Sequence, residues 1–190
     1  ANIPEKALEN YKKRAAMGGW DQEVYFSLLQ VAHLKQRLKE PKEDVLKAYE
    51  VALLYRPSRA EPLYFMAKML NEDKEFDKAF ELASWGLSIK EPDDILFVDK
   101  WVYDFGMLME YSIAAYWTDK YPEALVATQL MMTKPNLPEA FRNAGNNNLD
   151  WIHRRLAEGC EKNRNSLLDK RSEKGFKTNF ELIPIPAITP

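Results

Sequence analysis

The side chains that could perform catalysis are few in this sequence. A histidine could act as a general base and a cysteine as a nucleophile, but only His33, His153 and Cys160 are available. The histidines fall inside segments with helical periodicity, where core-edge or surface positions are more common than catalytic ones, and the cysteine is typical of a half-buried small residue. Gly-rich phosphate loops, His-Glu-x-x-His, Cys-x-x-Cys and nucleophile elbows are missing from the sequence. We therefore predict no catalytic residue, no metal ligand and no cofactor.

Two pairs of charged residues are candidates for binding chemistry. Arg56 and Arg59 flank a turn, and their guanidinium groups could bind a carboxylate or a phosphate, which makes them a weak candidate for an anion site. Pairing with Glu61 or with a helix end is the alternative that we favour. Asp93 and Asp94 superficially resemble a metal-binding pair, but acids in a first helical turn stabilise the helix by about 0.3–1 kcal/mol each. We interpret these two as capping residues.

The overall composition limits the class of protein further. The 190 residues suffice for one domain or a short array of repeats. Because 27 basic residues face 29 acidic ones, the net charge of -2 does not favour nucleic acid or anionic lipid as a partner. No apolar run approaches the roughly 20 residues of a membrane-spanning helix, and residues 1–10 lack an export signal. With a single cysteine, the sequence predicts a folded cytoplasmic protein without membrane insertion.

Repeated helix pairs are the elements that would position any binding residues. The second helix of a tetratricopeptide repeat (TPR) carries small residues at fixed offsets, and Ala79, Ala83 and Gly86 occupy such offsets. The template recurs with anchors at Ala7, Val45, Ala79 and Ala124. The last interval exceeds the usual period by about 11 residues, which predicts an insertion within residues 94–106. The expected fold class is therefore all-α, a TPR-like α–α superhelix, or right-handed solenoid of antiparallel helix pairs.

Local signals place the helix boundaries. Helices are expected near residues 4–17, 21–38, 43–55, 59–71, 75–89, 94–118, 122–133 and 138–158. Ser58 and Glu61 have the spacing of a capping box, and Pro62 and Pro122 suit a first helical turn. The first helix has no partner before it, so we expect either a different cap or a longer chain.

The sequence predicts two parts along the chain. Residues 1–160 would form the TPR-like repeat domain, and residues 161–190 a polar linker with an extended, Pro-rich tail. Pro184, Pro186 and Pro190 forbid a helix in this tail. Its isoleucines are expected to dock on the array, on a second copy of the chain or on a partner; the alternative is that the tail leads into a further domain.

A ligand-binding surface is expected on the inner face of the superhelix, which the first helix of each pair lines. The positions assigned to this concave groove are Phe26, Leu29, His33, Gln36, Glu61, Tyr64, Lys68, Asn71, Met109, Ile113 and Tyr116. Aromatic and polar groups alternate there, which suits a peptide or an adjoining domain better than a polyanion. A merely solvated face is the alternative.

Four short phrases carry a family resemblance: residues 13–25, residues 56–64, Leu96-Phe97-Val98 and Tyr103-Asp104. Together they resemble the TPR-like helical region that follows the catalytic domain in some family 2 glycosyltransferases, over roughly Pro4 to Pro135. In that family the sugar-nucleotide site and an Asp-x-Asp metal motif lie in an N-terminal α/β domain, which has no counterpart in these 190 residues. The resemblance implies an accessory or scaffold region associated with glycan assembly.

Three functions follow as hypotheses. The first is a non-catalytic interaction or scaffold module that binds a protein, a peptide or an adjoining glycosyltransferase domain, with Tyr64, Lys68, Asn71 and Tyr116 as anchors. The second is a glycosyltransferase fragment that transfers sugar from a nucleotide. The third is a structural module that forms a homo-oligomer through its first helix or its C-terminal tail.

Overall fold

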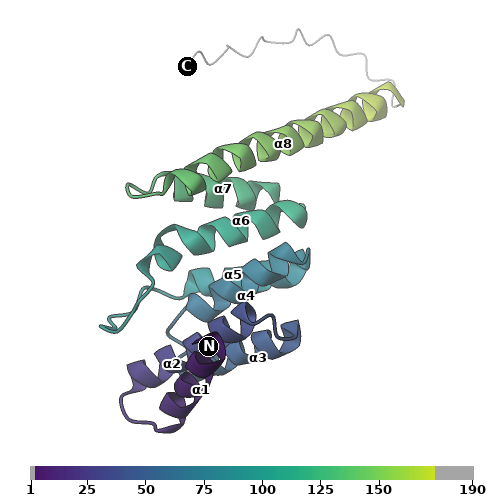
Figure 1. Ribbon diagram of the computed structural model, residues 1–190. Coiled ribbons are helices and arrows are strands. Elements are labelled where there is room, and N and C mark those ends of the chain that lie inside the picture. The colour runs from purple at the N-terminus through teal and green to yellow at the C-terminus, as the bar shows by residue number, and fades with distance from the viewer. Residues whose placement is uncertain (1–2, 174–190) are drawn as a thin grey trace. The chain divides into compact units, whose positions relative to one another are not determined.

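The computed structural model describes the backbone of residues 3–173 and the side chains of residues 3–166. Every regular element within these residues is a helix, and the described part contains no strand (Figure 1). This confirms the all-α fold class.

The helices follow the order expected from the repeat template. They are α1 (Ile3–Ala16), α2 (Asp21–Arg37), α3 (Lys42–Tyr55), α4 (Glu61–Glu72), α5 (Phe76–Ser88), α6 (Met107–Trp117), α7 (Tyr121–Met132) and α8 (Glu139–Glu173), with a π-helical turn, η1 (Val102–Gly106), before α6. The predicted boundaries of α1 to α5 and of α7 are confirmed to within about two residues, the error expected for such predictions. Pro62 and Pro122 lie in first turns, as predicted.

The helix predicted over residues 94–118 is wrong in its first part. Regular helix is missing from residues 89–99, and the π-helical turn leads into α6 only at Met107. The capping role predicted for Asp94 is also wrong, because its carboxylate pairs with Arg56 and Arg59. Two arginines of the connection between α3 and α4 therefore hold this segment, which lacks the hydrogen bonds of a regular helix.

The capping box predicted at Ser58 and Glu61 is wrong as well. Helix α4 begins at Glu61, its N-cap is Ala60, and no side chain caps it. The Glu61 carboxylate accepts hydrogen bonds from Arg59 and Tyr103 instead. A buried guanidinium two residues away thus competes successfully with the helix end for this carboxylate.

The chain divides into two compact units, Ala1–His153 and Arg154–Pro190. In the second unit α8 continues to Glu173, so residues 161–173 are helical where the sequence predicted a linker. The described side chains there are nearly all exposed, including Cys160. The predicted tail at residues 175–190 lies outside the described residues.

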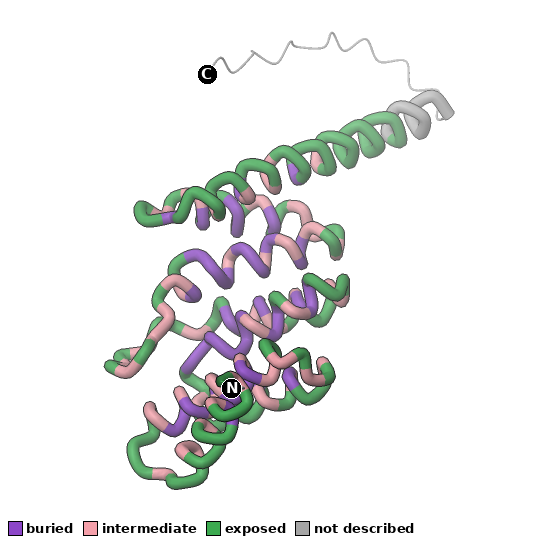
Figure 2. Tube along the Cα trace, viewed as in Figure 1, coloured by how far each residue is buried: buried purple, intermediate pink, exposed green. Residues whose placement is uncertain are grey.

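In the first unit, helices that follow one another in the sequence pack against each other, and the buried residues are distributed over all of them (Figure 2). The main core joins α2, α3, α4 and α6 through Tyr25, Tyr49, Leu63, Met66 and Met107. Small residues allow α5 to pack closely against its neighbouring helices: Ala79, Ala83 and Gly86 of α5 are all buried. The small-residue template therefore identified true packing positions. No helix in the described part of the chain is long and apolar enough to cross a membrane.

Candidate functional site

The residues assigned to the concave groove have mixed environments. Five of them are buried: Leu29, Glu61, Tyr64, Asn71 and Met109. Of the others, Phe26 packs against Phe97 with ring centroids 4.4 Å apart, and Lys68 is exposed, whereas Ile113 and Tyr116 are partly buried. The buried members serve the fold and are not accessible to a partner.

His33 belongs to a partly buried hydrogen-bond chain that ends at the exposed Gln36. The Tyr49 hydroxyl donates to Gln36 Oε1 at 2.8 Å and lies 2.9 Å from His33 Nδ1. Because the hydroxyl proton goes to Gln36, Nδ1 must carry a proton and donate to the Tyr49 oxygen. Burial lowers the pKa of His33 to about 4. The imidazole is therefore neutral near pH 7, and His33 is held as a packing residue against Phe65, 4.4 Å away between centroids.

Asn71 and Glu110 form a second buried polar pair. The Asn71 amide donates from Nδ2 to the Glu110 carboxylate and to the Glu110 backbone carbonyl, both at 3.0 Å. Asn71 Oδ1 is buried and has no hydrogen-bond partner in the described part of the chain. Burial raises the pKa of Glu110, and the Asn71 amide partly offsets this. The pair links α4 to α6 across their interface.

The Arg59 guanidinium is fully buried among internal acceptors. It binds both oxygens of the Glu61 carboxylate at 2.6–3.1 Å and Asp94 Oδ2 at 3.1 Å, and it stacks 4.5 Å above the Tyr25 ring. Although burial disfavours its charge, Glu61 and Asp94 hold the pKa of Arg59 above its usual range. Arg56 pairs with the same Asp94 through two hydrogen bonds, and Arg56 holds the pKa of Asp94 below its usual range. An external anion would have to displace these carboxylates.

The same network fixes the segment between α5 and α6. Arg59 donates to the carbonyl groups of Leu96 and Phe97 at 3.3 and 2.9 Å, while Gln22 Oε1 accepts from the amides of Ile95 and Leu96 at 3.0 and 2.9 Å. Phe97 has a φ of 45°, a left-handed conformation that is costly for an aromatic residue. The bonds to its neighbours compensate for that strain and hold the segment in one conformation.

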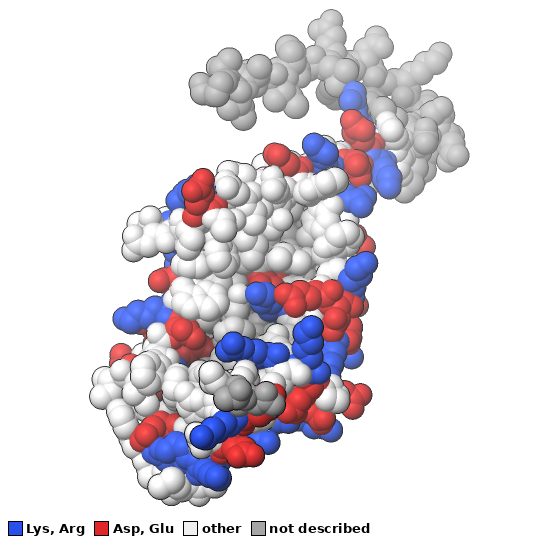
Figure 3. All heavy atoms as spheres, viewed as in Figure 1, with Lys and Arg blue, Asp and Glu red and all other residues white. Residues whose placement is uncertain are grey.

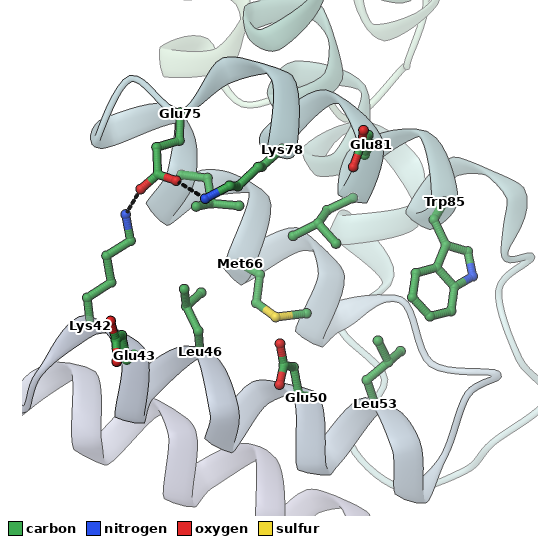
Figure 4. A pocket seen from close by; sticks show the side chains of 12 residues that line it. Lys42, Glu43, Leu46, Glu50, Leu53, Met66, Glu75, Lys78, Glu81 and Trp85 are labelled. Carbon is green, nitrogen blue, oxygen red and sulfur yellow. Dashed lines mark hydrogen bonds and ion pairs between the residues drawn. The ribbon is translucent and has the colours of Figure 1, made fainter.

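An open groove runs between α3 and α5 and passes over α4 (Figure 4). Its volume is about 490 Å³, and its lining residues are Lys42, Glu43, Leu46, Glu50, Leu53, Met66, Leu70, Glu75, Lys78, Glu81, Leu82 and Trp85. Leucine and methionine side chains form the floor, and charged side chains form both walls. Trp85 is 48% exposed, which leaves one of the largest apolar side chains open to solvent. This groove is the best candidate for a binding site.

Ion pairs close one end of this α3–α5 groove. Lys42 reaches from α3 to Asp73 and Glu75, at 2.5 Å from each, and Lys78 lies 2.6 Å from Glu75 (Figure 4). Lys78 and Lys42 hold the pKa of Glu75 down, to about 2, with Lys42 the larger influence. Both lysines of the lining are thus neutralised within the groove itself.

The sequence reasoning missed this groove because it assigned the second helix of each pair to packing. A usable signal was present. On α3, Leu46, Glu50 and Leu53 recur at intervals of one helical turn, and on α5, Glu81 and Trp85 do the same. Such a stripe of alternating apolar and acidic residues indicates a helix face that is not fully covered by its neighbours.

A second apolar hollow, of about 430 Å³, lies between α1 and α3. Ala16, Val24, Leu28, Val31 and Val51 are among the residues that line it. Two of its lining residues are large and exposed to solvent: Val51 is 50% and Tyr55 is 42% exposed. On the face shown in Figure 3, acidic and basic side chains are intermixed over α1 to α5, so no extended field of one sign is present on that face.

The geometry offers no metal centre. Within residues 3–166, no group of three or more histidine, cysteine, aspartate or glutamate side chains is arranged to hold a metal ion. No family model matches this sequence, and no curated protein or solved structure matches it either.

Proposed function

We propose that this chain is a non-catalytic, TPR-like helical-repeat module that binds a protein or peptide segment. The observation that carries the proposal is the α3–α5 groove, which is open to solvent, apolar at its floor and bordered by the half-exposed Trp85. Grooves of this kind accept the apolar face of a partner segment. Because both walls are helices packed on a common core, little order has to be gained on the receptor side when a partner binds.

Panning a random-peptide display library against the purified chain tests this proposal. The variant Leu46→Arg places a charge on the groove floor, and Trp85→Ala removes the exposed indole without disturbing buried residues. Trp151→Ala is the matched control, because Trp151 is 56% exposed and lies on α8, away from the groove lining. Circular dichroism and thermal unfolding verify that each variant is folded.

The expected result is a set of peptides that bind the wild type and the Trp151→Ala protein but not the Leu46→Arg or Trp85→Ala proteins. A library that yields no peptide with this dependence would overturn the proposal. Calorimetry with a nucleotide sugar and a divalent cation addresses the glycosyltransferase alternative, for which turnover or tight binding of the nucleotide sugar is the expected signal.

The link to glycan assembly stays a proposal based on resemblance. Arg59, Glu61, Phe97 and Tyr103, which belong to the phrases that carry the resemblance, meet in a single hydrogen-bond network. The network explains why these residues are needed together in this chain.

Self-association is a second candidate function, favoured by the exposed apolar residues beside the α1–α3 hollow. Val51 and Tyr55 line this hollow and are 50% and 42% exposed, and exposed apolar side chains gathered in one place favour an interface. Sedimentation equilibrium of the full chain tests this function. We expect a concentration-dependent dimer that Val51→Glu abolishes, and a monomer at all concentrations would refute it. Deletion of residues 175–190 tests the contribution of the tail in the same measurement.

A further inference from the structure

We infer that the α3–α5 groove selects a basic amphipathic helical segment of another protein. In this arrangement apolar side chains of the segment enter the floor, and its lysine or arginine side chains pair with Glu50 and Glu81. The inference rests on the proposed binding function and specifies the chemistry of the partner.

The charge of the lining is the first argument. Four glutamates and two lysines line the groove. Both lysines are engaged by Glu75 and Asp73 at the closed end. In the described part of the structure no ion pair or hydrogen bond engages the carboxylates of Glu43, Glu50 or Glu81. The groove therefore presents uncompensated negative charge directly beside its apolar floor.

The placement of these carboxylates is the second argument. Glu50 stands on α3 and Glu81 on α5, so the two walls each carry an acidic side chain, with Met66 of α4 between the walls (Figure 4). A helix with lysines along both edges of an apolar stripe could pair with both walls at once. Such pairing favours this partner over one that is apolar throughout.

Trp85 provides a third argument. Its indole lies at the open end of the groove near Leu53, opposite the end closed by Lys42 and Glu75 (Figure 4). The face of an exposed indole attracts ammonium and guanidinium groups. A basic residue of the partner would find an acidic wall and an aromatic face together at that end.

The same features argue against other partners. Nucleic acid, phosphorylated segments and anionic lipid surfaces would bring negative charge against Glu43, Glu50 and Glu81. An acidic peptide would meet the same repulsion. The spacing of Leu46 and Leu53, seven residues apart on α3, matches the two-turn repeat of an amphipathic helix lying along it.

Fluorescence anisotropy with three labelled 18-residue peptides tests the inference. All three carry leucine at the helical spacing i, i+3, i+4 and i+7 along their length. The remaining positions are all lysine in the first peptide, all glutamine in the second and all glutamate in the third. We expect the lysine peptide to bind the full chain about tenfold more tightly than the glutamine peptide at 50 mM salt, since it gains several ion pairs. The advantage should shrink at 300 mM salt, where screening shortens the reach of charges to about 6 Å.

Charge-reversal variants locate the effect. Glu50→Lys and Glu81→Lys should each weaken binding of the lysine peptide about fivefold and leave binding of the glutamine peptide unchanged. Asp150→Lys, an equal change of charge at an exposed position on α8, should alter neither. Leu46→Arg should abolish binding of both peptides, and Trp85→Ala should weaken both.

The outcomes separate this inference from the proposed function. If the glutamine peptide binds through Leu46 and the lysine peptide binds no more tightly, the partner chemistry is refuted and the binding module stands. Tighter binding of the glutamate peptide, or an equal loss in Asp150→Lys and Glu50→Lys, also refutes the partner chemistry. If no peptide binds in a way that depends on Leu46, both the inference and the proposed function fail.

Discussion

Arg59 and Glu61 form an ion pair in which neither side chain is exposed to solvent, although the residues are only two positions apart at the start of α4. Tyr103 and the backbone amide of Asp99 complete the coordination of the carboxylate at 2.7 and 3.2 Å. Because these donors come from the segment before α6, the ion pair joins α4 to the inserted segment. Its buried charges are satisfied only when that segment is in place.

The first prediction concerns the free energy of unfolding of Arg59→Met and Glu61→Gln. Each substitution alone should reduce it by about 3–5 kcal/mol, because the remaining partner keeps a buried and uncompensated polar or charged group. The double variant should lose markedly less than the sum of the two single losses. Urea denaturation measures all four corners of this cycle.

Lys100→Met is the control for this cycle. Lys100 pairs with Glu91 at 3.1 Å in the same region, but its side chain is 73% exposed, so the loss should be within about 1 kcal/mol. Additive losses for Arg59 and Glu61, or a loss for Arg59→Met as small as that of the control, would contradict a coupled buried pair.

The second prediction concerns the dependence of stability on pH at His33. The pKa of His33 is about 4 in the folded protein, lowered by burial, and about 6.5 in the unfolded chain. Only the unfolded state takes up the proton between these values. The contribution of His33 to stability is therefore complete above pH 6.5 and falls by about 2–3 kcal/mol as the pH falls towards 4.

His33→Asn isolates this effect, because the asparagine amide can donate to Tyr49 from nearly the position of Nδ1 and does not titrate. The difference in unfolding free energy between the wild type and His33→Asn should change in favour of the variant as the pH falls from 7 to 4. A difference that stays constant over this range would show that His33 has the same pKa in the folded and unfolded states, which would contradict the effect of burial.

The helices could be predicted from the sequence because their signals are local. Small residues such as Ala79 and Ala83 and first-turn prolines such as Pro62 act within a few residues, and the structure confirms them. The segment at residues 89–99 could not be predicted in this way. Its conformation depends on Arg59 and Gln22, which lie more than thirty positions away in the chain, and local patterns contain no information on such contacts.

The candidate site was harder to predict for a related reason. Helical periodicity identifies which residues share a face, but the neighbours of that face are set by packing. The sequence predicts that Glu61 caps a helix and lines the concave groove, yet it is fully buried. Glu50 and Trp85 lie on the second helices of their pairs, which the sequence assigns to packing, yet they border an open groove. The sequence shows which residue types share a helix face, but the packing of the helices determines whether that face is exposed.

The third prediction concerns Glu110, whose pKa is raised by burial. The folded protein therefore holds the protonated carboxyl more strongly than the unfolded chain does. Its stabilising contribution is present below the unfolded pKa and is lost as the pH rises through the folded pKa. Glu110→Gln, which keeps the shape and removes the titration, should be more stable than the wild type at pH 7, with a smaller difference at pH 4.

Chemical denaturation of both proteins at the two pH values measures this difference. Asn71→Leu provides a second background in which to measure this difference, since it removes the unpartnered Oδ1 together with the amide that donates to Glu110. In that background the advantage of Glu110→Gln at pH 7 should increase. An advantage that is equal at both pH values would exclude titration of Glu110 as its cause.

The fourth prediction concerns the close approach of α5 and α6 at Gly86. A Cβ atom at this position would lie 2.2 Å from Cε of Met107, whose side chain is itself only 1% exposed. Gly86→Ala should therefore reduce the free energy of unfolding by about 1–3 kcal/mol, despite the better helix propensity of alanine. The same substitution in a Met107→Ala background should cost less than it does in the wild type, because the atoms that the new methyl group meets are then absent. Gly159→Ala is the matched control: it lies within α8 with no atom near the added Cβ, so it should raise helicity and should not lower stability. Calorimetric unfolding of the wild type, the three single variants and the double variant measures these effects. A Gly86→Ala protein as stable as the wild type would mean that α5 and α6 are less closely packed than the structure requires.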